Sequence, residues 1–368
     1  MSGDALLLEA ERLGQALVPI AEGRNPGRVN RELVSAIASA GLFSRLFAAD
    51  GVTAKDLCLI RQGLARVCPE AETAFAVQGL GGIPILLHGR PEFRDDWIPR
   101  IVAGEVVAAF ALTEPDAGSD AASLQLKADH DGEGYLLTGE KAYISNAPDA
   151  DVAVVFARTT PGAGAKGVTA FAVDTATEGI TGEPIEMISP HPLGRWRFEG
   201  AYVPGESVIG EVDQGFRVAM ETLDLFRPSV GAFTLGMAEA ALQIAVEHAT
   251  SREAFGGPIA GFQGVSHQLA DVRVAIEASR HLVYSAADAY DSRDRESLTA
   301  KSAMAKLFST EAAQQAIDVA IQVLGARGLE ADSTLAHLYK EVRGTRIYEG
   351  TSEIQRNIIA REMFQGRI

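Results

Sequence analysis

The chain has 368 residues and a formal net charge of −16, because 49 acidic residues outnumber 33 basic ones. Such a length predicts two or three domains, and the acidity argues against nucleic acid as a partner, since phosphate binding requires a basic surface. With only Cys58 and Cys68 and seven scattered histidines, we expect neither a disulfide framework nor a metal site. No apolar run has the length of a membrane span, and the first residues turn acidic too early for a signal peptide, so we expect a cytoplasmic protein.

The first hundred residues have helical periodicity. Apolar residues at helical spacing, with charges between them, predict helices over residues 4–22, 32–40 and 54–67. A short helix is predicted over 92–103, where Pro99 should force a break or a kink. We therefore expect an N-terminal helical domain over residues 1–106.

From residue 107 the pattern changes to strands. The run GAGAKG (162–167) fits a dinucleotide-binding glycine pattern, but a predicted strand follows it instead of a helix, so we interpret it as a hairpin turn. The strand pattern predicts a central β-barrel-like domain over residues 107–212. The expected strands lie between glycine, proline and aspartate turns, at 106–112, 123–129, 135–145, 151–159, 167–174 and 197–204.

Long helical elements return at residue 213. Apolar positions from Val265 to Tyr290 alternate in steps of four and three, which is the spacing of a bundle seam and more typical of a core than of a cofactor site. Further helices are predicted over 230–250, 298–324 and 352–363, so we expect a C-terminal four-helix bundle over residues 213–368. The predicted fold class is α+β, mainly α.

Two segments carry polar residues in unusual patterns. FALTEPDAGSD (110–120) runs from a strand into a polar turn, and for an isolated turn an ordinary loop is the favoured interpretation. RIYEGTSEIQRNIIAR (346–361) opens the last helix, where Ser352 and Gln355 have the spacing of a capping box. Glu349, which precedes Gly350, is not explained by that cap.

Together with GEKAYISN (139–146), LDLFR (223–227) and SREAFGGPIAGFQ (251–263), these segments resemble the acyl-CoA dehydrogenase family, in its short- and medium-chain-like branch. The resemblance covers nearly the whole chain. It implies an FAD enzyme that introduces an α,β double bond into an acyl-CoA thioester and passes the electrons to an electron-transfer flavoprotein. It also implies a homotetramer, or at least a dimer.

By this resemblance, Glu349 abstracts the α-proton and the flavin N5 accepts the β-hydride, because no amino-acid side chain can accept a hydride. The Glu349 backbone N–H helps to bind the thioester oxygen, and Gly350 lets the substrate approach closely. Some members place the base before the arginine of the LDxxR segment, but Phe226 stands there and cannot take a proton. The following helix N-terminus should lower the pKa of Glu349, whereas desolvation by an acyl chain should raise it.

The resemblance also assigns binding residues. The positions that match substrate contacts are Ser119, Asp224, Arg227 and Gly350. The positions that match contacts to FAD are Phe110, Leu112, Thr113, Gly118, Ser119, Tyr143, Ile144, Ser145, Thr351 and Glu353. Those that match contacts to the FAD of a neighbouring subunit are Arg252, Phe255, Gln263, Gln322 and Gly325.

Three departures from the family pattern stand out. Tyr143 replaces the usual tryptophan, and Ala326 and Arg327 replace a second glycine and an apolar residue. Arg327 could compensate electrostatically near the pyrophosphate of the neighbouring FAD. The stretch 191–204 is about seven residues shorter than usual, a change most easily taken up in a hairpin, and it lacks an Arg-Gly-Ser-x-Thr-like piece. We therefore expect a reshaped edge of the β domain.

Three alternative functions are open at this point. The thioester could be carried by an acyl-carrier protein, which loss of the adenosine-side contacts would favour, whereas Asp224 and Arg227 favour CoA. Oxygen could be the electron acceptor, although such oxidases are often much longer chains. A flavin-binding paralogue without turnover would have no reason to keep a carboxylate at Glu349.

Overall fold

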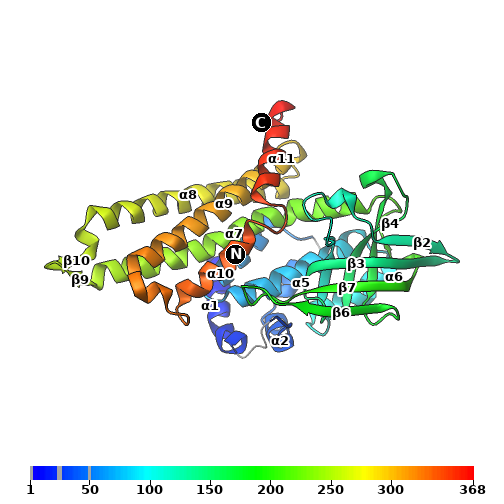
Figure 1. Ribbon diagram of the computed structural model, residues 1–368, viewed down its shortest axis with the longest axis horizontal. Helices are drawn as coiled ribbons and strands as arrows, with labels where there is room; N and C mark the ends of the chain where they lie inside the picture. The colour runs from blue at the N-terminus through cyan, green and yellow to red at the C-terminus, as the bar shows by residue number, and fades with distance from the viewer. Residues whose placement is uncertain (1–2, 23–26, 49–50) are drawn as a thin grey trace. The chain divides into compact units, whose positions relative to one another are not determined.

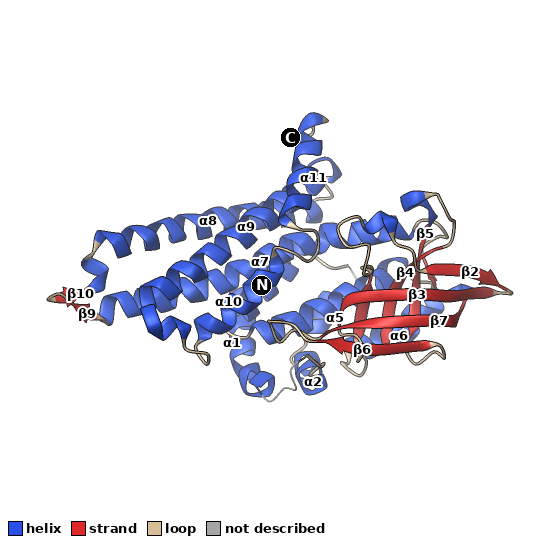
Figure 2. Ribbon diagram, in the orientation of Figure 1, coloured by secondary structure: helices blue, strands red, loops and turns tan. Residues whose placement is uncertain are grey.

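The computed structural model describes residues 3–22, 27–48 and 51–368, which form helices and one large mixed sheet (Figures 1 and 2). The chain divides into two compact units, and each is assembled from separate stretches of sequence. The first unit, called the helical unit below, lies within Met1–Val18, Thr53–Glu72 and Asp224–Ile368. The second, the sheet unit, lies within Pro19–Val52 and Thr73–Leu223.

The helical unit contains α4 (Ala54–Ala65), α8 (Gln263–Asp291), α9 (Arg295–Leu324), α10 (Thr334–Thr345) and α11 (Ser352–Phe364). Three further helices contribute residues to both units: α1 (Gly3–Glu22), α5 (Pro69–His88) and α7 (Gly215–Ser251). Side-chain caps begin several of these helices. Thr53, Asp294 and Ser333 each accept a hydrogen bond from a backbone N–H of the first turn, which satisfies a donor that the helix leaves unpaired.

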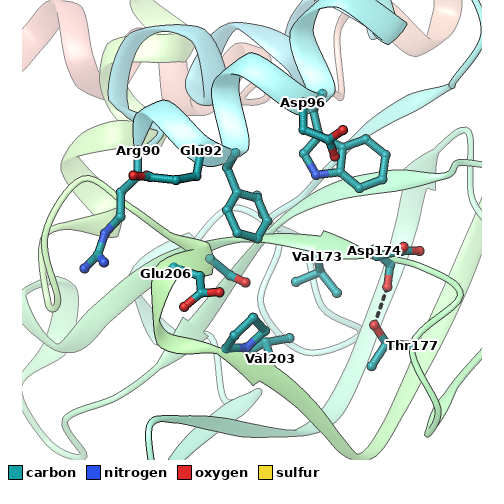
Figure 3. Close-up of a pocket in the computed structure, with 13 residues that line it drawn as sticks. Arg90, Glu92, Asp96, Val173, Asp174, Thr177, Val203 and Glu206 are labelled. Carbon is teal, nitrogen blue, oxygen red and sulfur yellow. Dashed lines mark hydrogen bonds between the residues drawn. The ribbon is translucent and has the colours of Figure 1, made fainter.

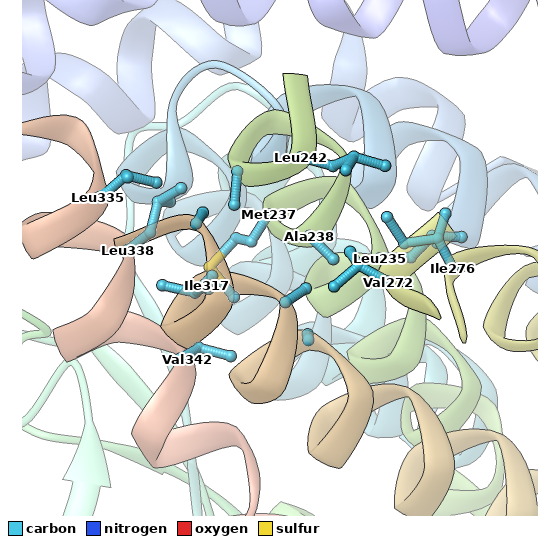
Figure 4. Close-up of a cluster of buried hydrophobic side chains, with 14 of the residues drawn as sticks. Leu235, Met237, Ala238, Leu242, Val272, Ile276, Ile317, Leu335, Leu338 and Val342 are labelled. Carbon is cyan, nitrogen blue, oxygen red and sulfur yellow. The ribbon is translucent and has the colours of Figure 1, made fainter. Parts of the chain in front are cut away.

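An apolar cluster from α7, α8, α9 and α10 forms the core of the helical unit (Figure 4). Met237, Val272 and Ile317 are among its fully or almost fully buried members. The central part of the predicted seam of α8 is confirmed, because Val272, Ile276 and Val283 are all buried. The first and last seam positions, Val265 and Tyr290, are half-buried. In this core α9 packs against both α8 and α10, and it also contacts α11.

The sheet unit is built on strands in the order β6-β7-β3-β2-β4-β5-β8, with β1 paired to β4. The pairs β1–β4 and β2–β4 are parallel and the others are antiparallel. A short α2 (Arg31–Ser39), α3 (Leu42–Leu46) and α6 (Pro91–Val102) belong to this unit. The strands are β1 (Ala108–Ala111), β2 (Lys127–Asp131), β3 (Gly134–Ser145), β4 (Val152–Arg158), β5 (Val168–Asp174), β6 (Ile180–Ile185), β7 (Leu193–Pro204) and β8 (Val208–Ile209).

The mainly helical fold with a central set of strands agrees with the sequence-based expectation, and the glycine-rich run 162–167 does lie in the connection of the antiparallel β4–β5 pair. The closed barrel and the four-helix bundle stay predictions. The sheet has a linear strand order from β6 to β8, and α10 is a helix that the sequence patterns missed. They also missed α5, whose sequence is apolar on all sides and contains Pro84.

Two local predictions differ from the structure. Helix α6 continues through Pro99 to Val102, so the proline causes no break, although it has no N–H to donate to the carbonyl group of Asp95. A kink at Pro99 stays a prediction. The last helix is capped by Thr351, whose hydroxyl accepts a hydrogen bond from Ile354 N at 3.3 Å, so Ser352 and Gln355 form no capping box. Gln355 is thereby free for a different role.

Helix α7 has the length and apolar composition of a membrane span. However, 78% of its most apolar stretch is buried inside the protein. Its apolar residues therefore supply core contacts, and we interpret α7 as a core helix.

Candidate active site

The predicted base lies in a short strained connection of the helical unit, between α10 and α11. Glu349 has φ 54° and Gly350 has φ 93°, so two successive residues adopt left-handed backbone conformations. Such a conformation is costly for a residue with a side chain and is kept only where the surroundings enforce it. A Cβ at position 350 would also lie 2.6 Å from Gln355 Nε2, so a side chain there would displace the end of the Gln355 side chain.

Three buried side chains hold the two carbonyl groups of this connection. Lys306 Nζ on α9 donates to Gly350 O at 2.7 Å. Arg227 Nε on α7 donates to Glu349 O at 3.2 Å. Gln355 Nε2 on α11 donates to both carbonyl oxygens, at 3.2 and 3.0 Å. We infer that these donors enforce the strained backbone.

The Glu349 carboxylate is in an unusual electrostatic position. Its Oε2 atom is shielded from solvent and has no hydrogen-bond partner among the described residues. Burial raises the pKa of Glu349 above the usual range, and the positive charges of Arg61, Lys306 and Arg227 oppose that rise. Desolvation by the protein therefore already favours a protonatable carboxylate, which is the property a general base needs.

Asp224 and Arg227, the predicted substrate contacts, are connected to this site. Arg227 is 5% exposed and donates to Asp224 Oδ1 at 3.2 Å as well as to the Glu349 carbonyl. Burial raises the pKa of Asp224, and the Arg227 charge opposes that shift. Since its guanidinium bonds the Glu349 carbonyl and Asp224, Arg227 fixes the backbone of the predicted base, a contact that the sequence alone did not indicate.

In the sheet unit, the two predicted flavin segments are joined by a buried ion pair. Lys141 on β3 is fully buried, and its Nζ donates to Glu114 Oε1 at 2.8 Å and to Leu112 O at 2.9 Å. The N–H of Ala142 donates to Thr113 O at 3.1 Å. The turn that follows Phe110 is therefore fixed against the strand that leads to Tyr143, Ile144 and Ser145.

The end of β3 is also strained. The pairing of β3 with β7 is irregular between Lys141 and Ile144, and Tyr143 has φ 56° there. Its aromatic side chain is 57% exposed. Ile144 is buried, while Ser145 is half-buried and hydrogen-bonded through its hydroxyl to His191. Gly118 and Ser119 are exposed at the end of the polar turn.

The residues predicted to reach a neighbouring subunit are exposed in the helical unit. Arg252 and Phe255 lie at the β9–β10 hairpin (Glu253–Ala254 and Gly257–Pro258), where Phe255 is 99% exposed and has φ 52°. Gln263 begins α8, and Gln322 and Gly325 lie where α9 ends.

A cationic cluster lies beside these residues. Burial, and then the positive charges of Arg327 and Arg252, lower the pKa of His248. Both arginines therefore act electrostatically on one histidine, although they come from segments far apart in sequence. The lowered pKa leaves His248 largely uncharged near neutral pH, so the positive charge here is that of the two arginines.

The pocket shown in Figure 3 belongs to the sheet unit and is a different feature. It measures about 760 Å³, lies between α6 and residues of β5 and β7, and as described contains none of the predicted site residues. Glu92, Asp96, Asp174 and Glu206 line it together with a single basic residue, Arg90. Four carboxylates around one guanidinium would repel a polyanion, so this pocket suits neither a pyrophosphate nor CoA.

Several site residues were missed by sequence reasoning. Lys306, Gln355, Lys141 and His191 each contact a predicted site residue or the connection that carries one. A lysine inside a mainly apolar stretch was a usable signal for Lys306 in SAMAKLF, and a weaker one for Lys141, which precedes AYI but follows Glu140. Such a charge is buried only with partners. For Gln355 and His191 no comparable signal exists.

Three family models match successive parts of the chain. The N-terminal domain of acyl-CoA dehydrogenases matches residues 8–105, the middle domain matches 109–201, and the C-terminal domain matches 213–364. The chain belongs to the acyl-CoA dehydrogenase family.

Relatives agree with this assignment over nearly the full length. The chain is 34% identical to a probable acyl-CoA dehydrogenase of Mycobacterium tuberculosis, FadE25, over 94% of this chain and 90% of that protein. It is 38% identical to the mitochondrial short-chain specific acyl-CoA dehydrogenase of Mus musculus, over 81% of this chain and 73% of that protein.

Solved structures share the fold. Butyryl-CoA dehydrogenase from Megasphaera elsdenii has a TM-score of 0.91 and 31% identity, covering 98% of both chains. The FAD complex of PigA has a TM-score of 0.92 and 28% identity, covering 99% of this chain and 97% of that one. A structure described as the electron transferring flavoprotein of Acidaminococcus fermentans has a TM-score of 0.92 and 31% identity, covering 99% and 98%.

Proposed function

We propose that this acyl-CoA dehydrogenase removes the α-proton of an acyl-CoA thioester with Glu349 and so forms an α,β double bond. The observation that carries the proposal is the carboxylate itself, whose Oε2 is shielded and unpaired and whose backbone is held by three side chains. An unsatisfied buried carboxylate is costly for a folded protein unless a substrate uses it. The Glu349 N–H, fixed by the same clamp, would donate to the thioester oxygen and stabilise the charge that develops there.

The residues present fit FAD. Tyr143 and Phe255 expose aromatic surface from strained backbone positions, which suits contact with a planar ring system. The two arginines that act on His248, Arg252 and Arg327, suit a pyrophosphate, since an anion would relieve the repulsion between their charges. Bound FAD would accept the β-hydrogen as a hydride, which no side chain of this chain can do.

Replacing Arg327 by glutamine should weaken FAD binding about tenfold, because a charge-assisted hydrogen bond to phosphate is lost. Fluorescence titration of the apoprotein with FAD, at low and at high salt, measures the effect. The affinity of the variant should also depend less on salt. Arg343→Gln, an exposed change on α10, serves as the control. Equal affinity of the Arg327 variant and the parent at low salt would exclude a role for Arg327 in binding FAD.

Replacing Lys306 by methionine should slow flavin reduction by about tenfold, because Gly350 O loses its strongest donor and the strained connection relaxes. The variant also removes a positive charge that lowers the pKa of Glu349. The pKa should therefore rise, and the acidic limb of the pH–rate profile should move to higher pH. Lys301→Met, earlier on the same helix, should leave the profile in place. An unmoved limb in Lys306→Met would contradict the electrostatic part of this role.

The remaining assignments are part of the proposal. The family models support domains over residues 1–106, 107–212 and 213–368. The exposed Phe255 and the cationic cluster support an assembly, a homotetramer as is typical of the family, in which one subunit contacts the FAD of another. An electron-transfer flavoprotein is the proposed acceptor and the cytoplasm the proposed location.

Anaerobic titration tests the function directly. The purified protein should contain FAD, and acyl-CoA thioesters from short to long, with branched and alicyclic acids included, should bleach it. If only a thioester on an acyl-carrier protein bleached the flavin, the carrier of the substrate would be that protein instead of CoA, and the proposed α,β-dehydrogenation would stand. Bound FAD that no thioester bleaches would identify a paralogue without turnover and overturn the proposal.

A further inference from the structure

The connection between β6 and β7 places a histidine beside a predicted flavin residue. In this segment, EMISPHP (186–192), prolines stand on both sides of His191. A residue before proline is restricted to extended conformations, and proline fixes its own φ. The N–H of Asn146 donates to Pro192 O at 2.9 Å, which ties the end of the segment to the end of β3. The His191 side chain is therefore presented from a stiff and anchored backbone.

His191 Nε2 and Ser145 Oγ lie 2.8 Å apart, within hydrogen-bond distance. The sheet register fixes this approach, because Ser145 is paired with Leu193, two residues after His191, and Ile144 with Gly194. Gly194 is required for this close register, since a Cβ there would lie 2.2 Å from Ala147 O. Both side chains of the hydrogen-bonded pair are half-buried, within one unit of the chain.

The pair is electrically neutral. Burial lowers the pKa of His191 to about 4, so its ring carries no charge near neutral pH. A neutral imidazole has one donor and one acceptor nitrogen, whereas a serine hydroxyl has one hydrogen and two lone pairs. When Nε2 takes one of these positions, the rotation of the hydroxyl stops and its remaining hydrogen-bonding positions point in fixed directions.

We propose that His191 is a positioning residue for the Ser145 hydroxyl, and that the Ser145–His191 pair sets the reduction potential and the reduction rate of the flavin. This inference rests on the proposed function, since it places FAD beside the end of β3. The connection that ends at Pro192 would thus have a specific role, because it supplies a fixed partner for a serine two residues after Tyr143.

The test is a double-mutant cycle on the FAD-loaded protein, with Ser145→Ala, His191→Ala and the double variant. The flavin midpoint potential and the rate of anaerobic reduction by a thioester that bleaches the parent are measured for each. Loss of one net hydrogen bond predicts a rate change of about threefold to tenfold in each single variant, with a shift in the flavin potential. Because both changes remove the same interaction, the double variant should match the single ones instead of multiplying their effects.

Two further variants separate positioning from folding. Glutamine can place an amide near the position of Nε2, so His191→Gln should restore most of the parent rate and potential. His130→Ala, an exposed change on β2, should alter neither. If His191→Ala folds, multiplicative effects in the cycle overturn the proposal. If it does not fold, Ser145→Ala is the reference, and a folded His191→Gln variant with the rate and potential of Ser145→Ala overturns the proposal. A parent chain that cannot be loaded with FAD overturns the proposed function, whereas loaded variants with parent potential and rate overturn only the role of His191.

Discussion

Glu349→Gln should retain FAD but lose reduction of the flavin by acyl-CoA. Glutamine has nearly the same size, and its amide cannot take the α-proton, so the general-base contribution of about 10²–10⁴-fold is lost. Anaerobic mixing with the acyl-CoA that bleaches the parent best, followed at the visible flavin band, measures the rate. Glu330→Gln, an exposed change after α9, should keep the parent rate.

The pKa of Glu349 gives this prediction a pH dependence. Burial raises the folded-state pKa above 4.5, the ordinary value. Only the ionised carboxylate accepts a proton, so the parent rate should fall as the pH falls through that raised pKa. For stability the sign is reversed, because the contribution of this group is complete below pH 4.5 and is lost as the pH rises through the folded pKa.

The stability of the variant is therefore an independent measurement. Glu349→Gln carries no charge to bury, so at neutral pH it should be at least as resistant to urea as the parent. A well-folded variant that still reduces its flavin at the parent rate would exclude Glu349 as the base. A variant that is less stable than the parent at neutral pH would show that the carboxylate is not held in a desolvated position.

Sequence patterns predicted the elements of this fold where one periodicity was clear. The α8 seam from Val265 to Tyr290 and the strand at 168–174 are examples. An element that is buried on one face has apolar residues at a regular spacing, and a strand that is buried on both faces has a continuous apolar run. The sequence of helix α5 has no such regular spacing. It is apolar on all sides and contains glycines and Pro84, which locally indicate a loop.

The site was predicted as a set of residue types, and the structure adds what local sequence does not encode. Nothing in the sequence around Tyr143, Phe255 and Glu349 indicates a positive φ, since such strain is imposed by tertiary contacts. The spacing of Ser352 and Gln355 fitted a cap, yet the hydroxyl one residue earlier, on Thr351, makes it. His191 meets Ser145 only because β3 and β7 pair in one particular register.

The pair of Lys141 and Glu114 is the polar interaction of the sheet unit on which both predicted flavin segments depend. Lys141 is fully buried, and Glu114 accepts hydrogen bonds from Gln125 N at 2.6 Å and Leu126 N at 2.9 Å in addition to the one from Lys141. Burial lowers the pKa of Lys141 to about 8, with the charge of Glu114 opposing this shift, so the lysine is mostly charged at pH 7. Each charge is therefore tolerated because the other is present.

Lys141→Met should lower the free energy of unfolding by about 3–5 kcal/mol, because it leaves the buried Glu114 charge without its cation. Chemical unfolding of the apoprotein, followed by a probe in the sheet unit, measures this loss. Adding Glu114→Gln to Lys141→Met should restore part of the stability, since no uncompensated charge remains. Lys127→Met, an exposed change on β2, should change the stability by less than about 0.5 kcal/mol. If the double variant were as unstable as the sum of its single changes, the two residues would not act as a pair.

FAD affinity should fall with Lys141→Met even where the protein stays folded, because Leu112 O and the turn that follows it lose their hydrogen bond to β3.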